Sequence, residues 1–310
     1  MTRGKNVVFT LLFLMFCISA CSPKQVSNLN SGEITVTVSI LPQKYFINRI
    51  GGEKIHVNVM VGPGESPHTY EPKAQQMTDL SNSSVYFKIG VEFEEAWMDR
   101  ITSANPDMQI VDLSKEITHI PTASFSHEST KTFGDQIVHE QEENEHQHND
   151  QTDAHIWTSP QNGILIAQQI YLSLAELDPE NEPFYQQNLN GLLADINNLQ
   201  RQIQSALMEN GADKFLVFHP AWGYFSKEFG LEQIVVEVGG TEPSARELAA
   251  VISEAQKAGI HVIFAQPEFS TQTAEYIAEE INGSVILISP LAENWLENLS
   301  LIAEEIAAAN

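Results

Sequence analysis

The sequence predicts an α/β protein of two similar lobes, in which parallel sheets flanked by helices are joined by one long α-helix and leave a ligand cleft between the lobes. Strand-like and helical segments alternate from residue 34 onward, and this alternation favours parallel sheets covered by helices. The alternation starts again after residue 213, and a long helical stripe of leucines separates the two runs. With 310 residues, 42% of them hydrophobic, the chain can build two cores.

The first predicted lobe covers residues 34–180. Val, Ile and Thr alternate in its strand-like segments, and apolar residues recur at helical spacing between them. We expect strands at 34–41, 57–61 and 85–89 and helices at 44–50 and 71–80. The periodicity is lost between His119 and His155, which indicates a long mobile insertion at 119–154, and helical spacing returns after Trp157.

A connecting helix is predicted within residues 181–212. Apolar side chains recur every three or four positions between Pro183 and Asn210, as they do on one face of a helix of many turns. This stripe consists of Leu189, Leu192, Leu193, Ile196, Leu199 and Ile203. Packing in a core explains the stripe, and its length suits a helix that joins two lobes.

The second predicted lobe covers residues 213–310 and repeats the pattern of the first. Strands are expected at 215–218, 234–238, 262–264 and 285–288, and helices at 243–258, 271–281 and 295–309. Open parallel sheets bind ligands at the carboxyl ends of their strands. The cleft between two such lobes is therefore the expected place for a ligand.

Residues 1–21 are typical of a bacterial lipoprotein signal peptide. Arg3 and Lys5 precede an apolar run too short to span a bilayer, and the sequence ISAC at 18–21 is similar to a lipobox. We expect export to the cell envelope, as a periplasmic protein or on the outer face of the cytoplasmic membrane, with a lipid anchor on Cys21 and a flexible tether at 22–33. Both cysteines of the chain lie in this leader, so a metal site must use His, Asp or Glu.

The charge of the chain narrows the kinds of partner. Asp and Glu number 41 against 16 Lys and Arg, which gives a formal net charge of −25. A polyanion such as DNA or RNA would be repelled, so no nucleic-acid partner is expected. Cations are the ligands that this field attracts, although an acidic surface also serves solubility alone.

Three of the ten histidines stand at predicted strand ends or loop edges. His68 follows a Gly- and Pro-rich turn after a strand, His155 closes the polar insertion, and His219 ends the apolar segment 215–218. A single histidine is more often a hydrogen-bonded structural residue than a ligand. Neutral imidazoles that converge on one cleft from both lobes are, however, the ligands suited to zinc.

Three segments around these histidines resemble the metal-specific solute-binding lipoproteins of ABC importers. They are GPGESPHTYEP at 62–72, DAHIW at 153–157 and FHPAWGY at 218–224, and the resemblance covers nearly the whole chain after the leader. In that family each segment supplies one ligand to zinc or manganese, which implies His68, His155 and His219. Manganese-type members tend to have Glu at the third position, so His219 indicates zinc, with Mn²⁺ as the alternative.

The fourth ligand stays open in the sequence. The family usually places a carboxylate after the last strand, whereas this chain has SPLAE at 289–293. Glu293, a water held by Ser289, or Glu65 are the candidates, and Gln266 is a weaker candidate for support of the site. Three histidines with water or one carboxylate make an adequate tetrahedral zinc site.

The insertion carries further histidines among its acidic residues. They are His127, His139, His146 and His148. The resemblance to the family implies that they form an auxiliary metal collector or sensor, and their binding would be weak because ordering the loop costs entropy. A solvated loop without a role is the alternative.

The resemblance implies a receptor that captures zinc and delivers it to an ABC permease driven by a separate ATPase subunit. A receptor for manganese or iron and a surface adhesin are the alternatives. A zinc hydrolase is disfavoured, because the sequence has no His-Glu-x-x-His helix, no Gly-x-Ser-x-Gly elbow and no phosphate-binding glycine loop. We therefore expect a binding protein and not an enzyme.

Overall fold

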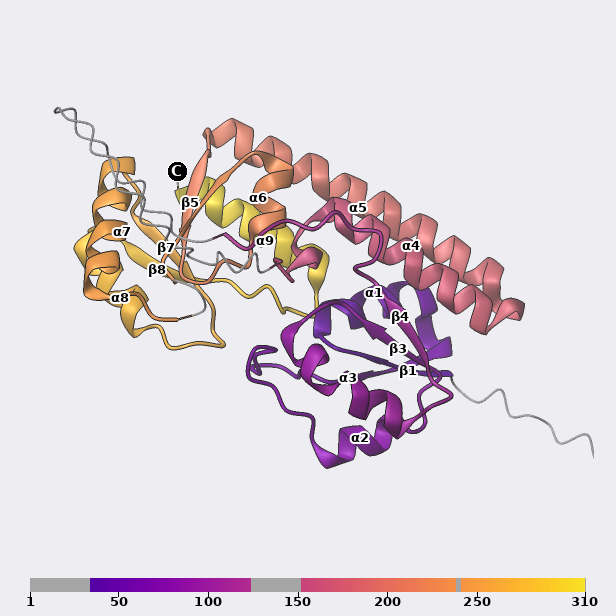
Figure 1. The fold of residues 1–310 in the computed structure, drawn as a ribbon. Coiled ribbons are helices and arrows are strands. Elements are labelled where there is room, and N and C mark those ends of the chain that lie inside the picture. Colours follow the sequence, from indigo (N-terminus) through magenta and orange to yellow (C-terminus); the bar gives the residue numbers. More distant parts are fainter. Residues whose placement is uncertain (1–33, 124–151, 238–240, 310) are drawn as a thin grey trace, which may run out of the picture. The chain divides into compact units, whose positions relative to one another are not determined.

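Two four-stranded parallel sheets are the centre of the computed structural model, which describes residues 34–123, 152–237 and 241–309. The first sheet has the order β2-β1-β3-β4 and the second the order β6-β5-β7-β8, so both share one topology (Figure 1). The strands are β1 (Ile34–Val38), β2 (Ile55–Val59), β3 (Val85–Lys88), β4 (Gln109–Asp112), β5 (Lys214–Val217), β6 (Glu232–Val235), β7 (Val262–Ala265) and β8 (Ser284–Leu287). The predicted fold class of two similar lobes is confirmed.

Helices separate the strands of both sheets. They are α1 (Leu41–Gly51), α2 (Ala74–Leu80), α3 (Glu92–Ala104), α4 (Pro160–Leu177), α5 (Glu182–Asn210), α6 (Gly223–Phe229), α7 (Ala245–Ala258), α8 (Gln272–Glu280) and α9 (Trp295–Ala309). Short 3₁₀ helices occur at η1 (Gly52–Lys54), η2 (Ile156–Thr158) and η3 (Pro179–Asn181). Parallel strands need such crossover connections, because the chain must return to the same end of the sheet each time.

The long helix α5 carries the leucine stripe that the sequence indicates. Its buried residues are Tyr185, Leu189, Leu192, Ile196, Leu199, Ile203 and Leu207, at steps of three and four. This face packs against α1 and α4, which precede α5 in the chain, and against the C-terminal helix α9. Gly211 ends the helix in the left-handed region, with φ of 67°. A helix of 29 residues spans roughly 43 Å, which suits a connection between lobes.

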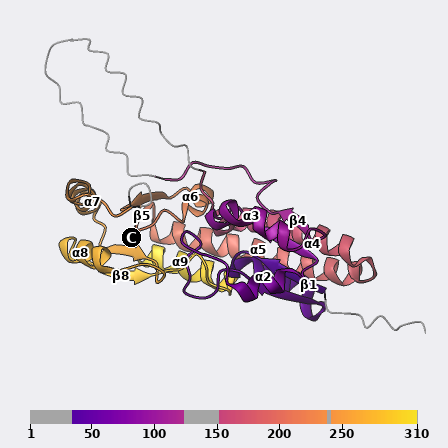
Figure 2. The same ribbon diagram turned by 60° about the horizontal axis from the view of Figure 1, so that its bottom comes forward.

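The second sheet lies between two apolar layers. Alternate strand residues face opposite sides: Leu216 and Ile263 pack with α7 and α8, whereas Phe215 and Phe264 belong to the cluster that contains the buried faces of α5 and α9. Figure 2 shows α7 and α8 together at one end of the molecule, beside the strands that they cover. Both faces of the second sheet are therefore buried, as is usual for parallel sheets.

The first strand is shorter than the sequence analysis expects. It ends at Val38 instead of residue 41, because the Gln43 side chain accepts hydrogen bonds from the backbone N–H groups of Ser39 and Ile40 and so starts α1. Pro42 in the first turn fits the same start. Local side-chain bonds of this kind decide element boundaries, and the other expected boundaries lie within three residues of the observed ones.

Three elements carry no assignment in the sequence analysis, namely α3, β4 and α6. The first turn of α3 is acidic, with Glu92, Glu94 and Glu95, and only three of its residues are buried. Strand β4 lies at the edge of the first sheet and has no fully buried residue. Because few residues of α3 and β4 are buried, apolar periodicity does not predict them, and tertiary contacts stabilise them instead.

The expected leader 1–21, the tether 22–33 and most of the insertion 119–154 lie outside the described residues. The ends of the insertion are described, and an isolated antiparallel bridge joins Pro121 to Thr152. Among the residues that the structure describes, no helix is both long enough and apolar enough to cross a membrane.

Candidate metal centre

His68 lies in the loop between β2 and α2. Its Nδ1 is 2.9 Å from Oε1 of Glu92, the first residue of α3. The ring is edge-on to that of His219, with 4.8 Å between the ring centroids. A residue after the second strand thus meets a carboxylate that follows the third strand, at the carboxyl edge of the first sheet.

His155 lies near the start of the described segment 152–237 and immediately precedes η2. Oδ1 of Asp153 accepts from the backbone N–H of His155 and lies 2.8 Å from its Nδ1. The indole of Trp157 donates to the Pro290 carbonyl, and that of Trp295 donates to the Trp157 carbonyl. These bonds fix the segment of His155 against the C-terminal part of the chain.

His219 follows β5 by two residues. Its Nδ1 is 2.5 Å from Oε2 of Glu237, which follows β6. The Nε2 atom of His219 is buried and has no hydrogen-bond partner among the described residues. Because a buried polar nitrogen without a partner is costly, this atom is suited to bind a ligand.

The structure brings the three predicted histidines together. One ligand atom from each of His68, His155 and His219 lies within 4.8 Å of the others. Two nitrogens that share a tetrahedral zinc ion at about 2.0 Å are about 3.3 Å apart, so a modest approach of the side chains would close the set around one ion. The three residues come from both halves of the chain, on either side of α5.

Each histidine has a carboxylate at Nδ1, and the sequence analysis did not identify these partners. They are Glu92, Asp153 and Glu237. A carboxylate at Nδ1 fixes the ring and its tautomer, so that Nε2 is the nitrogen that can bind a metal. Asp153 could have been found from its place two residues before His155. The other two are distant in sequence from their histidines, and only the fold reveals them.

Burial and these carboxylates shift the pKa values in the cluster. Burial lowers the pKa of His68, but the hydrogen bond and charge of Glu92 outweigh it and raise the pKa above its usual value. Burial would raise the pKa of Glu92, but the hydrogen bond and charge of His68 lower it to about 2. For His219, burial is the larger effect and holds the pKa below its usual value despite Glu237. The imidazole of His219 is therefore neutral at neutral pH, as a metal ligand must be, and Glu92 is an anion.

The three candidates for the fourth ligand have other partners in the structure. Glu293 pairs with Lys44 at 2.8 Å and is half-exposed. Glu65 accepts from Lys73 and from the backbone N–H of Gly62. Ser289 donates to Oε1 of Glu268 at 2.5 Å. Among the described residues, the compact ligand group contains the three histidines alone. His127, His139, His146 and His148, like Cys21, lie outside the described residues.

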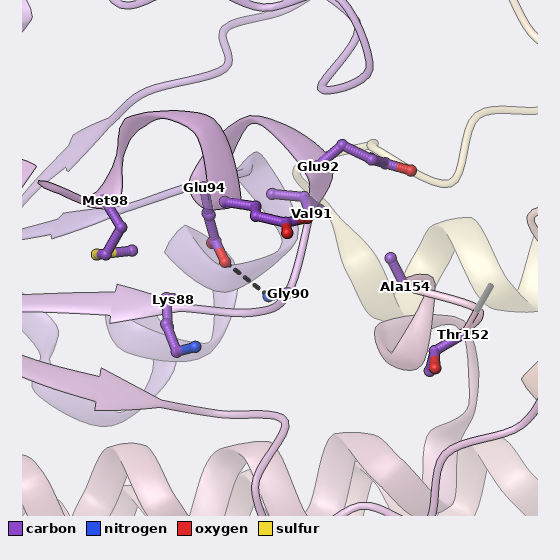
Figure 3. Close-up of a pocket in the computed structure, with 9 residues that line it drawn as sticks. Lys88, Gly90, Val91, Glu92, Glu94, Met98, Thr152 and Ala154 are labelled. Atoms are coloured by element: carbon purple, nitrogen blue, oxygen red, sulfur yellow. Dashed lines mark hydrogen bonds between the residues drawn. The ribbon is translucent and has the colours of Figure 1, made fainter. Parts of the chain in front are cut away.

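A cavity lies next to the candidate site, and no histidine lines it. It has a volume of about 380 Å³ and is lined by Lys88, Glu92, Glu94 and Thr152, among others. Figure 3 shows the Glu94 carboxylate bonded to the backbone N–H of Gly90, whereas the Glu92 side chain points away from Lys88. Glu92 lines this cavity and also contacts His68 of the histidine cluster.

Two lobes of equal topology, with a cluster of carboxylate-bound imidazoles drawn from both, define a metal-binding receptor of the solute-binding class. The chain belongs to the family of ZnuA, the periplasmic component A of the zinc-uptake complex, whose family model matches residues 36–309. Proteins of this family are receptors and not enzymes.

Solved structures and a curated relative agree with this family. The crystal structure of ZnuA is 37% identical, with a TM-score of 0.78, and the match covers 89% of this chain and 98% of that chain. A ZnuA deletion mutant with zinc bound is 38% identical, with the same TM-score and coverage. The zinc-binding protein AdcA of Streptococcus pyogenes serotype M3 is 23% identical over 287 residues, which are 92% of this chain and 55% of AdcA. The chain thus spans about half the length of AdcA.

Proposed function

We propose that this protein captures a zinc ion through His68, His155 and His219 and delivers it to a membrane import system. The observation that carries the proposal is the convergence of three imidazoles from both lobes, each with a carboxylate at Nδ1. Imidazole suits zinc better than it suits manganese, which favours carboxylate and water oxygens. The zinc named in the family description and in the zinc-bound ZnuA deletion mutant supports the same ion.

Calorimetric titration of the metal-free protein with Zn²⁺ and with Mn²⁺ tests this proposal. We expect zinc to bind far more tightly than manganese. Replacing His219 by Ala should weaken zinc binding by orders of magnitude and leave the circular dichroism spectrum unchanged. Equal affinity for the two ions, or no affinity for zinc, would contradict the assignment and favour the manganese alternative.

The import partners belong to the same proposal. A receptor that binds one ion between two lobes serves a permease that accepts the ion, and a separate ATPase subunit supplies the energy. The family description names a component of an uptake complex, which supports such partners. Co-purification of the protein with the permease from detergent-solubilised membranes tests this step. The adhesin alternative predicts no such complex.

Lipid anchoring through Cys21 is the last part of the proposal. The leader pattern at 18–21 supports it. Replacing Cys21 by Ser should move the exported protein from the membrane fraction to the soluble fraction. A variant that stays with the membrane would contradict the anchor.

A further inference from the structure

A small cavity beside the histidine cluster is lined in part by polar side chains that have no role in the proposed zinc site. His68 and His155 line it on one side, and Gln266, Glu268 and Phe269 line it on another. Its volume is about 10 Å³. A cavity needs about 10–15 Å³ measured in this way to hold one water molecule. The space therefore suits one water and is too small for a further side chain.

Two buried polar atoms belong to residues of this cavity. Nε2 of Gln266 and Oε2 of Glu268 each expose less than 1 Å² and have no hydrogen-bond partner among the described residues. Nε2 of Gln266 is a donor, and the carboxylate oxygen of Glu268 is an acceptor. Buried polar atoms almost always have partners, so the pair indicates a ligand that both accepts and donates. Water has this property.

The orientation of Glu268 is fixed from its other oxygen. The Ser289 hydroxyl donates to Oε1 of Glu268 at 2.5 Å, and the backbone N–H of Leu291 donates to the Ser289 hydroxyl at 3.1 Å. Oε1 is therefore occupied, and Oε2 is the oxygen that remains for a ligand. Gln266 and Glu268 follow β7, the strand beside β5, so that they stand at the same edge of the second sheet as His219.

We propose that Glu268 and Gln266 hold a water molecule that binds the captured metal ion as its fourth ligand. The inference rests on the proposed zinc site. One lone pair of this water binds the ion and the other accepts from Nε2 of Gln266, while one of its hydrogens is donated to Oε2 of Glu268. Three imidazoles and one water complete a tetrahedral zinc site. Glu268 is then a positioning residue, and Ser289 acts on the site through it.

Direct coordination by Glu268 fits the structure less well. The ligand atoms of the three histidines lie within 4.8 Å of one another, and among the described residues no oxygen of Glu268 belongs to this group. One water between Glu268 and the metal ion would link the two and leave the hydrogen bond from Ser289 to Glu268 intact. Residues that hold a metal ligand in place without touching the metal commonly change the metal affinity by about 10- to 100-fold.

Glu268→Gln tests the inference against Glu279→Gln, which removes one charge from an exposed position of α8 in the same lobe. Zinc affinity is measured by competition with a chromophoric chelator. We expect Glu268→Gln to weaken binding by about 10- to 100-fold, Ser289→Ala to weaken it less, and Glu279→Gln to leave it unchanged. Thermal unfolding of the metal-free variants shows that each is folded.

Spectroscopy of the loaded protein separates a positioning role from a structural one. X-ray absorption at the zinc edge of the wild-type protein should show three imidazole nitrogens and one oxygen at about 2.0 Å. The visible bands of the cobalt-loaded protein should change in Glu268→Gln and coincide with wild type in Glu279→Gln. Equal zinc affinity and equal cobalt spectra for both variants would overturn the inference. A zinc-bound crystal structure with a carboxylate oxygen of Glu268 on the ion would also overturn it.

The proposed function can fail separately from this inference. It fails if the wild-type protein does not bind zinc tightly or if His219→Ala binds zinc as well as wild type does. Tight wild-type binding that is lost in His219→Ala but kept in Glu268→Gln removes only the water-mediated role of Glu268.

Discussion

At the scale of single residues, the chemistry of the site depends on the nitrogen that each imidazole presents. A histidine has two ring nitrogens, and the one that faces a carboxylate keeps its proton. Glu92, Asp153 and Glu237 take Nδ1 of the three histidines, which leaves Nε2 for the metal in each case. The carboxylates also increase the electron density of the rings and so strengthen the bond to a cation.

Glu237 provides a sharp test of this arrangement, because it contacts His219, whose buried Nε2 has no hydrogen-bond partner among the described residues. In Glu237→Gln the amide oxygen can still accept from Nδ1 of His219, but the negative charge is lost. We expect zinc affinity to fall by about 10- to 100-fold, with little change in fold, measured by chelator competition and circular dichroism.

Glu254→Gln is the matched control, since Glu254 is exposed on α7 in the same lobe. It removes the same charge from the overall field of the protein. If both variants lose affinity equally, the acidic field and not the bond to His219 is responsible, and the role assigned to Glu237 is wrong.

At the scale of elements, the first turn of α3 places two glutamates in opposite settings. Glu92 points to His68 and has a pKa lowered to about 2, although burial alone would raise it. Glu94 is buried and accepts from the backbone N–H groups of Ile89 and Gly90, and burial raises its pKa to about 7 in spite of these bonds and one from Ser39. One turn of helix thus carries both an anion for the site and a group that is protonated in weak acid.

The raised pKa of Glu94 predicts a pH dependence of stability. The unfolded chain releases this proton near the usual value of 4.5, whereas the folded protein keeps it up to about 7. The contribution to stability is therefore complete below about 4.5 and is lost as the pH rises through about 7. Denaturant unfolding from pH 5.5 to 8 should show wild type losing stability relative to Glu94→Gln.

Glu95→Gln, at the exposed neighbouring position, should follow wild type across this pH range. A wild-type stability that runs parallel to that of Glu94→Gln would mean that Glu94 is already ionised in the folded protein at pH 5.5. The bonds from the backbone N–H groups would then outweigh its burial.

At the scale of the whole molecule, the candidate site is assembled from segments that both sheets position. His68 and Glu92 follow strands of the first sheet, while His219, Glu237 and Glu268 follow strands of the second. The carboxyl ends of parallel strands supply all of these residues, as is general for ligand sites in open α/β folds. A ligand that joins both sets stabilises the folded chain by mass action.

Deletion of residues 127–148 should therefore leave the tight zinc site present. The three histidines and their carboxylates lie outside this segment. Zinc at about 100 times its dissociation constant should stabilise both the deletion variant and wild type by about 2.7 kcal/mol, and a chelator should reverse the effect. Thermal melts with and without zinc measure it.

Loss of the zinc-dependent shift in the deletion variant alone would place the tight site in the insertion. His219→Ala in the wild-type background is the control, and its melting temperature should be insensitive to zinc at the same concentration. The two variants together separate the main site from the auxiliary histidines.

Local sequence patterns were enough to predict the fold class and to single out the three histidines. Regular alternation of apolar segments indicated two parallel sheets, and the stripe from Leu189 to Ile203 indicated a long helix. These signals are local in the chain, and a residue next to a strand end can be recognised without knowing its neighbours in space. Zinc followed from His219 by resemblance to a family, and the family match supports it.

The glutamates that contact His68 and His219 could be found only from the fold. Glu92 is 24 positions from His68 and Glu237 is 18 from His219, and no spacing rule links them. Ser289 drew attention in the sequence as a departure from the family, but its contact with Glu268 depends on the neighbouring positions of β7 and β8. Long-range pairs of this kind are set by sheet register and strand order, which apolar periodicity does not specify.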